Sequence, residues 1–466
     1  MNSNVLENNV KNEINEIKNE VDGTLEKKQT RMSKWASEIR NIRTKLSMLS
    51  VEHATHSRAH LESIISFNTG IFYTGLFFSF LDWSYVFPWV LMGLSISSTW
   101  TTVSHHVIHG GYPNMEPDHT HTHTHDKAKS IKDKDNNNTH TRAHAHNRYN
   151  RFTYGKTLRR RVLDWMDYIL PEAWFCEHNI YHHYKLNETT DPDNVQQNLV
   201  LLRTMNAPYI VKYGIVALFA LTWRVLYYSP NSFKYYLARV LKREMNDGDD
   251  YKQLTLVGLV LNVWPAWVSK AQYIVTVILP LACYRAICFA PVYFAHAYFP
   301  SVVTYSHIRN VVLNYVLADM LCNVHTFAII TPNHSGTDMY LYKSSVTAKS
   351  DEWLLRQCIS STNYTLGTDV VDYLHGWLNY QIEHHLFPDL SAYEYQLIHA
   401  DVRAACEKYG IPYICENVFV RLWKTVKIMT GQDSMPYYEG SELERYVNEP
   451  WSQNIDNLQH IREIRE

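Results

Sequence analysis

The sequence has few glycines and cysteines and almost no net charge. Its 466 residues include 16 Gly and 7 Cys, and 44 basic against 46 acidic residues leave a formal charge of −2. The cysteines form no CxxC pair, which argues against a cysteine-based zinc ribbon and against a disulfide scaffold. The balanced charge argues against nucleic acid as a partner, because proteins that bind it usually carry a basic excess.

The first 50 residues also lack the apolar core of a secretory signal peptide. They are rich in Asn, Glu and Lys, and we expect residues 1–55 to form a polar N-terminal tail, partly disordered or coiled-coil. The segment 431–466 is expected to be a polar C-terminal tail. Four apolar residues at 4-3-4 spacing predict one short amphipathic helix or coiled coil in the first tail: Val10, Ile14, Ile17 and Val21.

Long apolar runs are present, together with 33 Tyr and 13 Trp, an aromatic content compatible with a membrane-interface belt. The runs 61–81 and 84–104 each have the ~20 residues that a helix needs to cross a bilayer, and they predict a hairpin. Two further spans are expected within 271–298 and 309–331. These runs predict an all-α integral membrane protein with about four transmembrane helices in two hairpins and a cytosolic helical cap.

Two other apolar runs are less regular. The run 207–228 contains Lys212 and Arg224, which we expect to hold it at the membrane interface with their charged ends in water. The run 254–268 is short for a span, and it is left unassigned.

The segment 113–150 is a low-complexity insert rich in His, Thr, Lys, Asp and Asn. It contains nothing that could bury a core, and we expect an expanded loop without catalytic function. Alternate histidines on an extended strand face the same way and could hold a divalent ion loosely. The alternating histidines are His119, His121, His123 and His125, and the insert ends with His140, His144 and His146.

Outside the insert, histidines gather in three clusters beside the apolar runs. Each of the first two clusters contains an i, i+4 pair, which projects from one face of a helix. Imidazole suits iron, zinc, copper and nickel, and seven such ligands are too many for one tetrahedral zinc. Two metals sharing a nitrogen-rich cage is therefore the economical interpretation. The seven candidates are His105, His109, His178, His182, His183, His384 and His385, and His334 after the last apolar run is an eighth.

The pattern HxxxH, HxxxHH and QxxHH around membrane hairpins resembles the membrane-bound fatty acid desaturase family. The similarity is to the front-end acyl-lipid and sphingolipid desaturases, whose third box begins with Gln, here Gln381. The run Trp377–Pro388 is close to that family's signature, and stretches around Asn333, Trp353 and Cys406 continue the similarity. We therefore place a desaturase domain at 56–430, interrupted by the insert.

The resemblance implies a di-iron centre that activates O2 and removes two hydrogens from an unactivated acyl chain of a lipid or acyl-CoA. It assigns no catalytic residue beyond the metal ligands, and it gives His106 no matched role. Asp191 and Asp193 either hold ligating imidazoles by hydrogen bonds or form a solvated Asp-Pro turn. The implied iron ligands are His105, His109, His178, His182, His183, His334, His384 and His385, with Gln381 where other branches have His.

Partners and location follow from the same resemblance. Two electrons per turnover must come from outside, and the chain has no His-Pro-Gly-Gly haem motif of a fused cytochrome b5 domain. A separate donor of the cytochrome b5 or ferredoxin type is therefore expected. All three boxes must share one side of the membrane, so an even number of crossings must separate His183 from His334. We expect an endoplasmic reticulum membrane, with both termini and the boxes cytosolic.

Two other functions are compatible with parts of the pattern. A lipid hydroxylase of the same superfamily would use the same metal cage. A divalent-metal transporter could carry a histidine-rich loop, but it needs polar ligands near the bilayer midplane, whereas here the clusters flank the spans.

Overall fold

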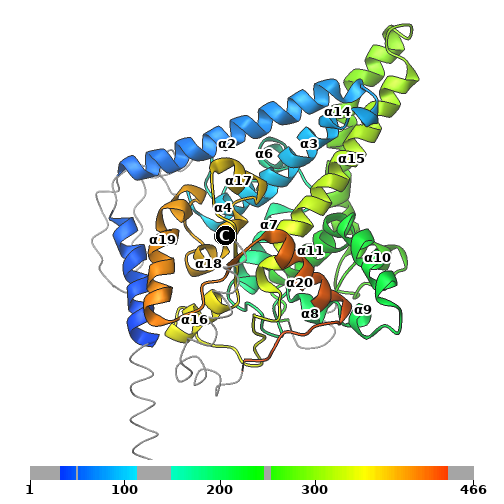
Figure 1. Cartoon of the computed structure of the whole chain (residues 1–466). Coiled ribbons are helices and arrows are strands. Elements are labelled where there is room, and N and C mark those ends of the chain that lie inside the picture. Colours follow the sequence, from blue (N-terminus) through cyan, green and yellow to red (C-terminus); the bar gives the residue numbers. More distant parts are fainter. Residues whose placement is uncertain (1–31, 49–50, 113–147, 246–252, 439–466) are drawn as a thin grey trace, which may run out of the picture.

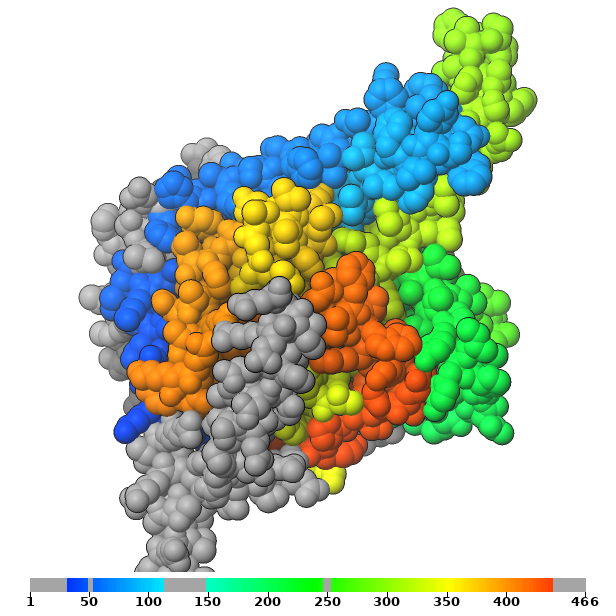
Figure 2. Space-filling model, in the orientation of Figure 1, coloured from blue at the N-terminus to red at the C-terminus, as the bar shows by residue number. Residues whose placement is uncertain are grey.

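The computed structural model describes residues 32–48, 51–112, 148–245 and 253–438, and this part of the chain is mainly helical. A long helical bundle projects from a cap of shorter helices (Figures 1 and 2). The apolar pattern over 10–21 and nearly all of the histidine-rich insert lie outside the described residues. Over the described residues, the expected helical architecture is confirmed.

The bundle is built around α3 (Phe87–Ser98), which packs between α2 (Val51–Phe77) and α15 (Tyr305–Ile330). A glycine permits the close approach of α3 to α15, because a Cβ on Gly93 would lie 2.8 Å from the Ala318 carbonyl oxygen. Two short 3-10 turns, η1 (Phe78–Phe80) and η2 (Trp83–Tyr85), join α2 to α3.

The bundle continues without a break into the cap. α3 continues through the π-helix η3 (Thr99–Ser104) into α4 (His105–His109), and the three segments together form a single rod. On the other side, α13 (Lys270–Tyr273) and the π-helix η7 (Ile274–Ile278) lead into α14 (Leu279–Tyr298), which packs against α15. The ends of the bundle helices therefore fix the positions of the side chains that they carry into the cap.

Within the described ranges, three helices are long and apolar enough to cross a membrane: His53–Phe80, Lys270–Tyr298 and Tyr305–His334. A fourth span results if the bent pair Tyr209–Ala220 and Arg224–Val240 counts as one. Three of the expected spans thus coincide with such helices. The other expected span contains α3, which is short and rich in serine and is not among the three. Its neighbours in the bundle cover it, so its surface need not match lipid tails.

The run 207–228 folds as α10 (Tyr209–Ala220), followed by a 73° bend into the helix Arg224–Val240. The sequence predicted that the charged ends in this run reach outward to water, but in the structure they turn inward. Lys212 is buried, and its Nζ donates to two backbone carbonyl oxygens at 2.8 and 3.0 Å. Carbonyl oxygens inside the protein therefore bind the ammonium group that the sequence alone placed at the membrane surface.

The cap consists of short helices and one small sheet, in which β1 (Asn363–Tyr364) pairs in parallel with β2 (Cys415–Glu416). The unassigned run 254–268 forms one short helix, packed with α7 and α11 in a small core of its own. The other cap elements are α6 (Leu158–Asp164), α7 (Pro171–Trp174), η4 (Phe175–His182), α8 (Val195–Asn198), α9 (Val200–Thr204), η5 (Arg224–Tyr228), α11 (Ser229–Val240), α12 (Leu256–Val260), η8 (Thr331–His334), α16 (Asp351–Ile359), α17 (Asp369–Leu374), η9 (Leu378–Tyr380), α18 (Gln381–Leu386), α19 (Ala392–Tyr409) and α20 (Val418–Thr430).

The polar N-terminal tail expected over 1–55 is folded from residue 32. A helix over 32–47 packs on the cap, and its Trp35 and Ile39 are fully buried. These apolar side chains pack in the main core together with cap residues distant in the sequence. At the other end, residues up to 438 also pair with the cap through backbone hydrogen bonds.

A buried ion network joins the bundle to the cap. Arg224 is fully buried, and its guanidinium donates to Asp167 Oδ2 at 2.7 Å and to Asp319 Oδ1 at 2.9 Å. Arg285 donates to the other oxygen of Asp319 at 2.5 Å. The network therefore ties the bend after α10 to both α14 and α15.

Replacing Arg224 should destabilise the protein strongly, because the change leaves the buried Asp167 carboxylate without its cation and leaves Asp319 with Arg285 alone. We expect Arg224→Met to cost about 3–5 kcal/mol, measured as a lower midpoint of thermal unfolding in detergent. The control is Arg58→Met, since Arg58 and Glu62 form an exposed pair on α2 that should contribute only about 0.3–0.5 kcal/mol. Equal small shifts in both variants would contradict a structural role for the network.

Candidate metal centre

The first histidine box lies on α4, which ends where Gly110 takes a φ of +94°. This left-handed conformation favours glycine and turns the chain away directly after His109. The next residue, Gly111, has no room for a side chain, because a Cβ there would lie 2.5 Å from the Leu390 carbonyl oxygen. His105 and His109 therefore project from the last turn of the rod into the cap.

The second box lies on the π-helix η4, instead of the α-helix that its i, i+4 spacing predicted. The His183 N–H donates to the His178 carbonyl oxygen at 3.1 Å, which is a five-residue step. A wider turn changes which side chains align, so His183 projects beside His178. His182 stays beside His178, as the sequence predicted, with ring centroids 5.1 Å apart, and it also belongs to a second group of ligands.

The third box lies on α18, and His334 lies directly after α15, at the end of η8. Glu383 anchors α18 to the small sheet, because its carboxylate accepts hydrogen bonds from Asn363 Nδ2 and the Tyr413 hydroxyl, both at 2.8 Å. Burial raises the pKa of Glu383 to about 7. This anchor leaves the two histidines that follow pointing toward the other boxes.

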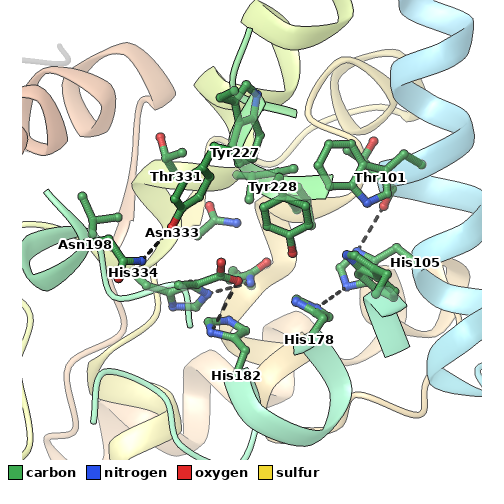
Figure 3. Close-up of a pocket in the computed structure, with 18 of the residues that line it drawn as sticks. Thr101, His105, His178, His182, Asn198, Tyr227, Tyr228, Thr331, Asn333 and His334 are labelled. Carbon is green, nitrogen blue, oxygen red and sulfur yellow. Dashed lines mark hydrogen bonds and ion pairs between the residues drawn. The ribbon is translucent and has the colours of Figure 1, made fainter. Parts of the chain in front are cut away.

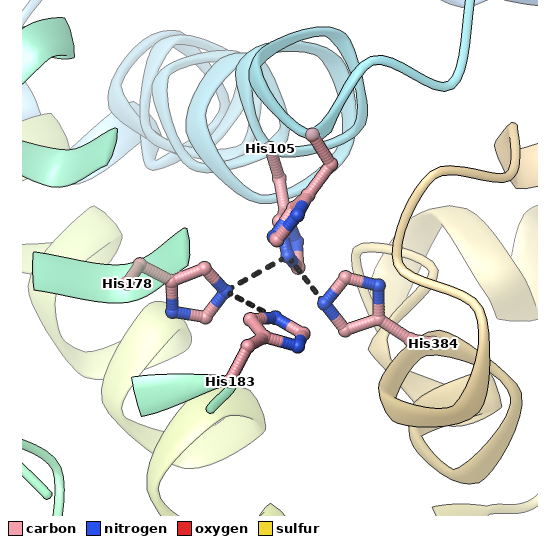
Figure 4. A group of neighbouring side chains, drawn as sticks. His105, His178, His183 and His384 are labelled. Carbon is pink, nitrogen blue, oxygen red and sulfur yellow. Dashed lines mark hydrogen bonds between the residues drawn. The ribbon is translucent and has the colours of Figure 1, made fainter. Parts of the chain in front are cut away.

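Five histidines from all three boxes form one group, with one ring nitrogen of each within 4.8 Å of the others. His105 Nε2 lies 2.9 Å from His384 Nε2 and 3.2 Å from His178 Nε2. His183 Nε2 lies 3.2 Å from His178 Nε2. Figure 4 shows these rings turned toward one point from different segments. The members are His105, His109, His178, His183 and His384.

Three further histidines, His182, His334 and His385, form a second group. Gln381 adjoins it, with Nε2 2.9 Å from His334 Nε2. The two groups touch, since the rings of His183 and His385 stack with centroids 4.3 Å apart. The structure thus brings together all eight histidines expected as ligands, and Gln381 with them, in one buried double cluster.

The donor set fits metal ions. Metal–nitrogen bonds of about 2.0–2.1 Å place adjacent ligand nitrogens about 3 Å apart, which matches the separations of 2.9 and 3.2 Å. Among the described residues, Nε2 of His109 and of His385 and Oε1 of Gln381 are buried without a hydrogen-bond partner. Leaving a buried polar atom unpaired costs about 1–3 kcal/mol, a cost that a bound cation removes. The cluster is compatible with metal binding.

Most of these imidazoles are neutral at neutral pH. Burial, reinforced by neighbouring imidazoles, holds the pKa of His183, His384 and His385 well below 6.5. His182 differs, because burial lowers its pKa but the Asp191 carboxylate outweighs burial and raises it above 6.5. Neutral imidazole is the form that binds a metal, so the folded cluster presents its lone pairs in that form.

Outward hydrogen bonds orient five of the rings. Each bond uses Nδ1, which leaves Nε2 directed toward the cluster, as is usual around protein metal sites. The five contacts are His105 to the Thr101 carbonyl (3.2 Å), His182 to the Asp191 carboxylate (3.0 Å), His334 to the Ser360 carbonyl (2.9 Å), His384 to the Tyr395 hydroxyl (3.0 Å) and His385 to the Gln357 amide oxygen (2.9 Å).

The two aspartates singled out from the sequence take different places. Asp191 is buried against His182 and also accepts a hydrogen bond from the Asn187 N–H at 2.7 Å, so it does not form a solvated turn. Asp193 Oδ2 is 3.8 Å from His182 Nδ1. Burial raises the pKa of Asp193 to about 6.

Sequence reasoning did not find three of the partners that orient the rings: Gln357, Tyr395 and the Ser360 carbonyl. No local pattern marks them, because each lies on a different element from the histidine it contacts. His106, which has no matched role, is buried beside the first box but lies outside both groups. Its Nδ1 is 2.6 Å from the Thr102 carbonyl oxygen.

A mainly apolar cavity borders the cluster (Figure 3). His105, His178, His182 and His334 form part of its wall. In Figure 3, Thr101 and His105 lie on the opposite side of the cavity from Asn198 and Thr331. The remaining wall is largely aromatic and aliphatic and includes Trp100, Trp174, Trp223, Tyr228, Leu378 and Met429.

Helices apolar enough to span a bilayer, together with a buried histidine-rich site, define an integral membrane protein with a candidate metal centre. The fatty acid desaturase family model matches residues 137–417, more than half of the chain, and the protein belongs to that family. The matched range starts after His105 and His109. The structure nevertheless packs this first box against His178 and His384.

Curated relatives match shorter stretches of the chain. It is 31% identical over 119 residues to the NADPH-dependent stearoyl-CoA 9-desaturase of Mycobacterium tuberculosis, covering 25% of this chain and 28% of that protein. It is 27% identical over 117 residues to the acyl-lipid (8-3)-desaturase of Mortierella alpina, covering 25% and 26%. It is 39% identical over 99 residues to the chloroplastic acyl-lipid (7-3)-desaturase of Chlamydomonas reinhardtii, covering 21% and 18%. The chain thus spans about a quarter or less of these relatives, and no solved structure matches it.

Removing the Gln357 side-chain oxygen should weaken metal binding, because His385 then loses the contact that orients it. We expect Gln357→Leu to lower metal affinity about 10- to 100-fold, measured as bound metal per chain after equilibration with a graded chelator. Gln396→Leu is the control, since Gln396 also lies in the cap but its amide donates to Asp369 and Asp372. Equal metal binding in the two variants would contradict the role assigned to Gln357.

Proposed function

We propose that the protein is a di-iron, O2-dependent desaturase that introduces a double bond into a fatty acyl chain. One observation carries the proposal: eight histidines and one glutamine from four separate segments meet at the wall of an apolar cavity. The membership of the chain in the fatty acid desaturase family supports the same conclusion.

The two groups of side chains are proposed to hold one iron each. Five histidines would serve the first ion, and three histidines with Gln381 would serve the second. Imidazole-rich sites suit zinc as well as iron, but a methylene C–H bond has no acidity for an acid–base mechanism to use. Iron bound here would supply the activation of O2 that breaking such a bond requires.

The reaction needs electrons from outside. Converting –CH2–CH2– to –CH=CH– releases two electrons and two protons, whereas reducing O2 to two waters consumes four of each. The other two electrons must come from a donor and the other two protons from solvent. We propose a separate donor protein of the cytochrome b5 or ferredoxin type.

The cavity would hold the acyl chain and exclude water. Trp100, Trp223 and Tyr228 pack at its buried end, with ring centroids 5.4 to 5.8 Å apart. Trp223 is fixed by a hydrogen bond from Nε1 to the Asn323 carbonyl oxygen at 2.9 Å. A rigid aromatic floor limits how far a chain can enter, and so decides which carbons lie opposite the histidines.

The site's position relative to the bundle supports one side of the membrane for all the ligands. His105 follows α3 and His334 follows α15, so the two antiparallel hairpins present their ligand-bearing ends to the same cap. We propose that this cap and both termini are cytosolic, on an endoplasmic reticulum membrane.

Expression in yeast should generate new double bonds, detected by mass spectrometry of fatty acids and long-chain bases. Purified protein should hold about two irons per chain, because the ligands form two groups. His182→Ala and His384→Ala should each abolish the product and lower the iron content, since each removes a ligand from a different group.

His399→Ala is the matched control, because His399 lies in the same cap on α19 and its Nδ1 contacts the Gln396 carbonyl oxygen. It should keep both product and iron. New hydroxyl groups in place of double bonds would identify a lipid hydroxylase. Stoichiometric zinc together with full activity in the His182 and His384 variants would overturn the di-iron proposal.

The histidine-rich insert should be dispensable, because the eight histidines and Gln381 of the double cluster come from other segments of the chain. Replacing residues 117–146 with a short Gly/Ser linker should leave iron content and product unchanged, since loop closure changes by only about 0.6 kcal/mol per doubling of length. The replacement should remove weak, exchangeable binding of zinc or nickel, measured by equilibrium dialysis. Loss of iron from the shortened protein would show that the ligand set is incomplete.

A further inference from the structure

The cavity beside the candidate metal centre has a buried end and a partly exposed end. Trp100, Trp223 and Tyr228 at the inner end are 2–4% exposed. The partly exposed end lies where α8, α10 and the end of α15 meet, and Figure 3 shows Asn198, Tyr227 and Thr331 together on that side. We call this end the mouth and define it by Asn198, Leu199, Phe219, Ile330 and Thr331.

Two sides of the mouth are carried by helices of membrane-spanning character. Ile330 and Thr331 belong to the candidate span Tyr305–His334, and Phe219 belongs to α10, the first half of the bent apolar pair. The outer face of α10 is apolar and open, with Ile210 75% and Leu218 65% exposed. Exposed apolar surface of this kind marks contact with a membrane or a partner, and on a helix apolar enough to span a membrane the contact is with lipid.

The helices that border the mouth offer no unpaired cation among the described residues. Figure 2 shows α10 and α20 side by side on this face, and α9 lies against α20. Binding a phosphate-bearing group usually requires Arg or Lys, but here every such side chain is engaged. The five are Arg203, Lys212, Arg421, Lys424 and Lys427, held by backbone carbonyls or by Asp338, Glu416 and Asp433.

We infer that the acyl chain enters this mouth from the bilayer while it is still attached to a membrane lipid, and not as acyl-CoA from water. The inference rests on the proposed desaturase function. An acyl chain in the bilayer meets a mainly apolar rim and need not leave its surroundings, whereas the phosphates of coenzyme A would meet no unpaired cation among the described residues of α8, α9, α10 and α20. Glycerophospholipids and sphingolipids share this chemistry, and the experiment separates them.

The order in which product appears tests the inference. Yeast expressing the full-length protein receives short pulses of 13C-labelled palmitic, oleic or linoleic acid. The acyl-CoA, glycerophospholipid and sphingolipid pools are then separated and analysed by mass spectrometry. We expect the labelled product with a new double bond to appear first in one of the two lipid pools and to lag in acyl-CoA.

The outcomes are distinct. Product that appears first as acyl-CoA overturns the inference and leaves the proposed desaturase function intact. No new double bond in any pool rejects the proposed function, and the inference with it.

Photolabelling gives a second measurement that needs neither iron nor an electron donor. Full-length protein in phosphatidylcholine vesicles is labelled with a phosphatidylcholine that carries a diazirine on its acyl chain. Peptides containing Phe219 or Ile330 should be labelled, and excess palmitoyl-CoA should not compete. Competition by palmitoyl-CoA, or labelling that avoids these peptides, would overturn the inference.

A charge on the exposed outer face of α10, beside the mouth, should reduce this labelling, since charged side chains are unfavourable where lipid tails lie. We expect Leu218→Glu to lower it about fivefold. Val370→Glu is the matched control, because Val370 is 69% exposed on α17, away from the mouth, and its labelling should equal that of the unaltered protein. An equal effect of the two variants would count against entry at the mouth.

Discussion

Eight imidazole rings share one buried space, and the rest of the structure depends on this constraint. Each ring has two nitrogens that need partners once water is excluded. The cap supplies the outer partners with backbone carbonyls and the side chains of Asp191, Gln357 and Tyr395. The inner nitrogens face one another at 2.9 to 3.2 Å, an arrangement that a shared cation would satisfy. Segments as far apart as His105 and His384, separated by 279 residues, must therefore be held within hydrogen-bond distance. The left-handed turn at Gly110 and the tight backbone contact at Gly111 lie directly after the first box.

The membrane helices and the histidines of the cluster could be predicted from the sequence because both are local signals. Run length marks an apolar helix, and close spacing marks a histidine box. The pairing of the histidines could not be predicted, because it depends on whether the backbone turns every 3.6 residues or more slowly. The π-helix η4 aligns His183 with His178 and directs His182 toward His334 and His385. Gln357 and Tyr395 were also out of reach, since they come from α16 and α19.

Charges within apolar runs show the same limit. Lys212 and Arg224 interrupt the apolar run 207–228 in the sequence. For a single helix with such charges, a position at the membrane interface is the sound expectation. Whether such a side chain turns outward to water or inward to a partner depends on what the other helices provide. Here Asp167 and Asp319 accept hydrogen bonds from Arg224, and backbone carbonyls accept them from Lys212. The segment thus lines the cavity with Phe219 and Trp223, while its outer face stays exposed and its two cations are bound on the inner side.

The π-helix that precedes the first box makes the direction of that box depend on the form of the backbone before it as well as on its own residues. A π-turn accommodates one residue more than the α-helical ladder requires. If Thr99–Ser104 kept all its residues but took a regular α-helical turn, everything beyond it would rotate by about one residue's step, about 100°, about the rod's axis. His105 and His109 would keep their identities and their spacing, yet they would face away from His178 and His384. The register of η3 is therefore part of the site, although none of its residues is expected to bind a metal.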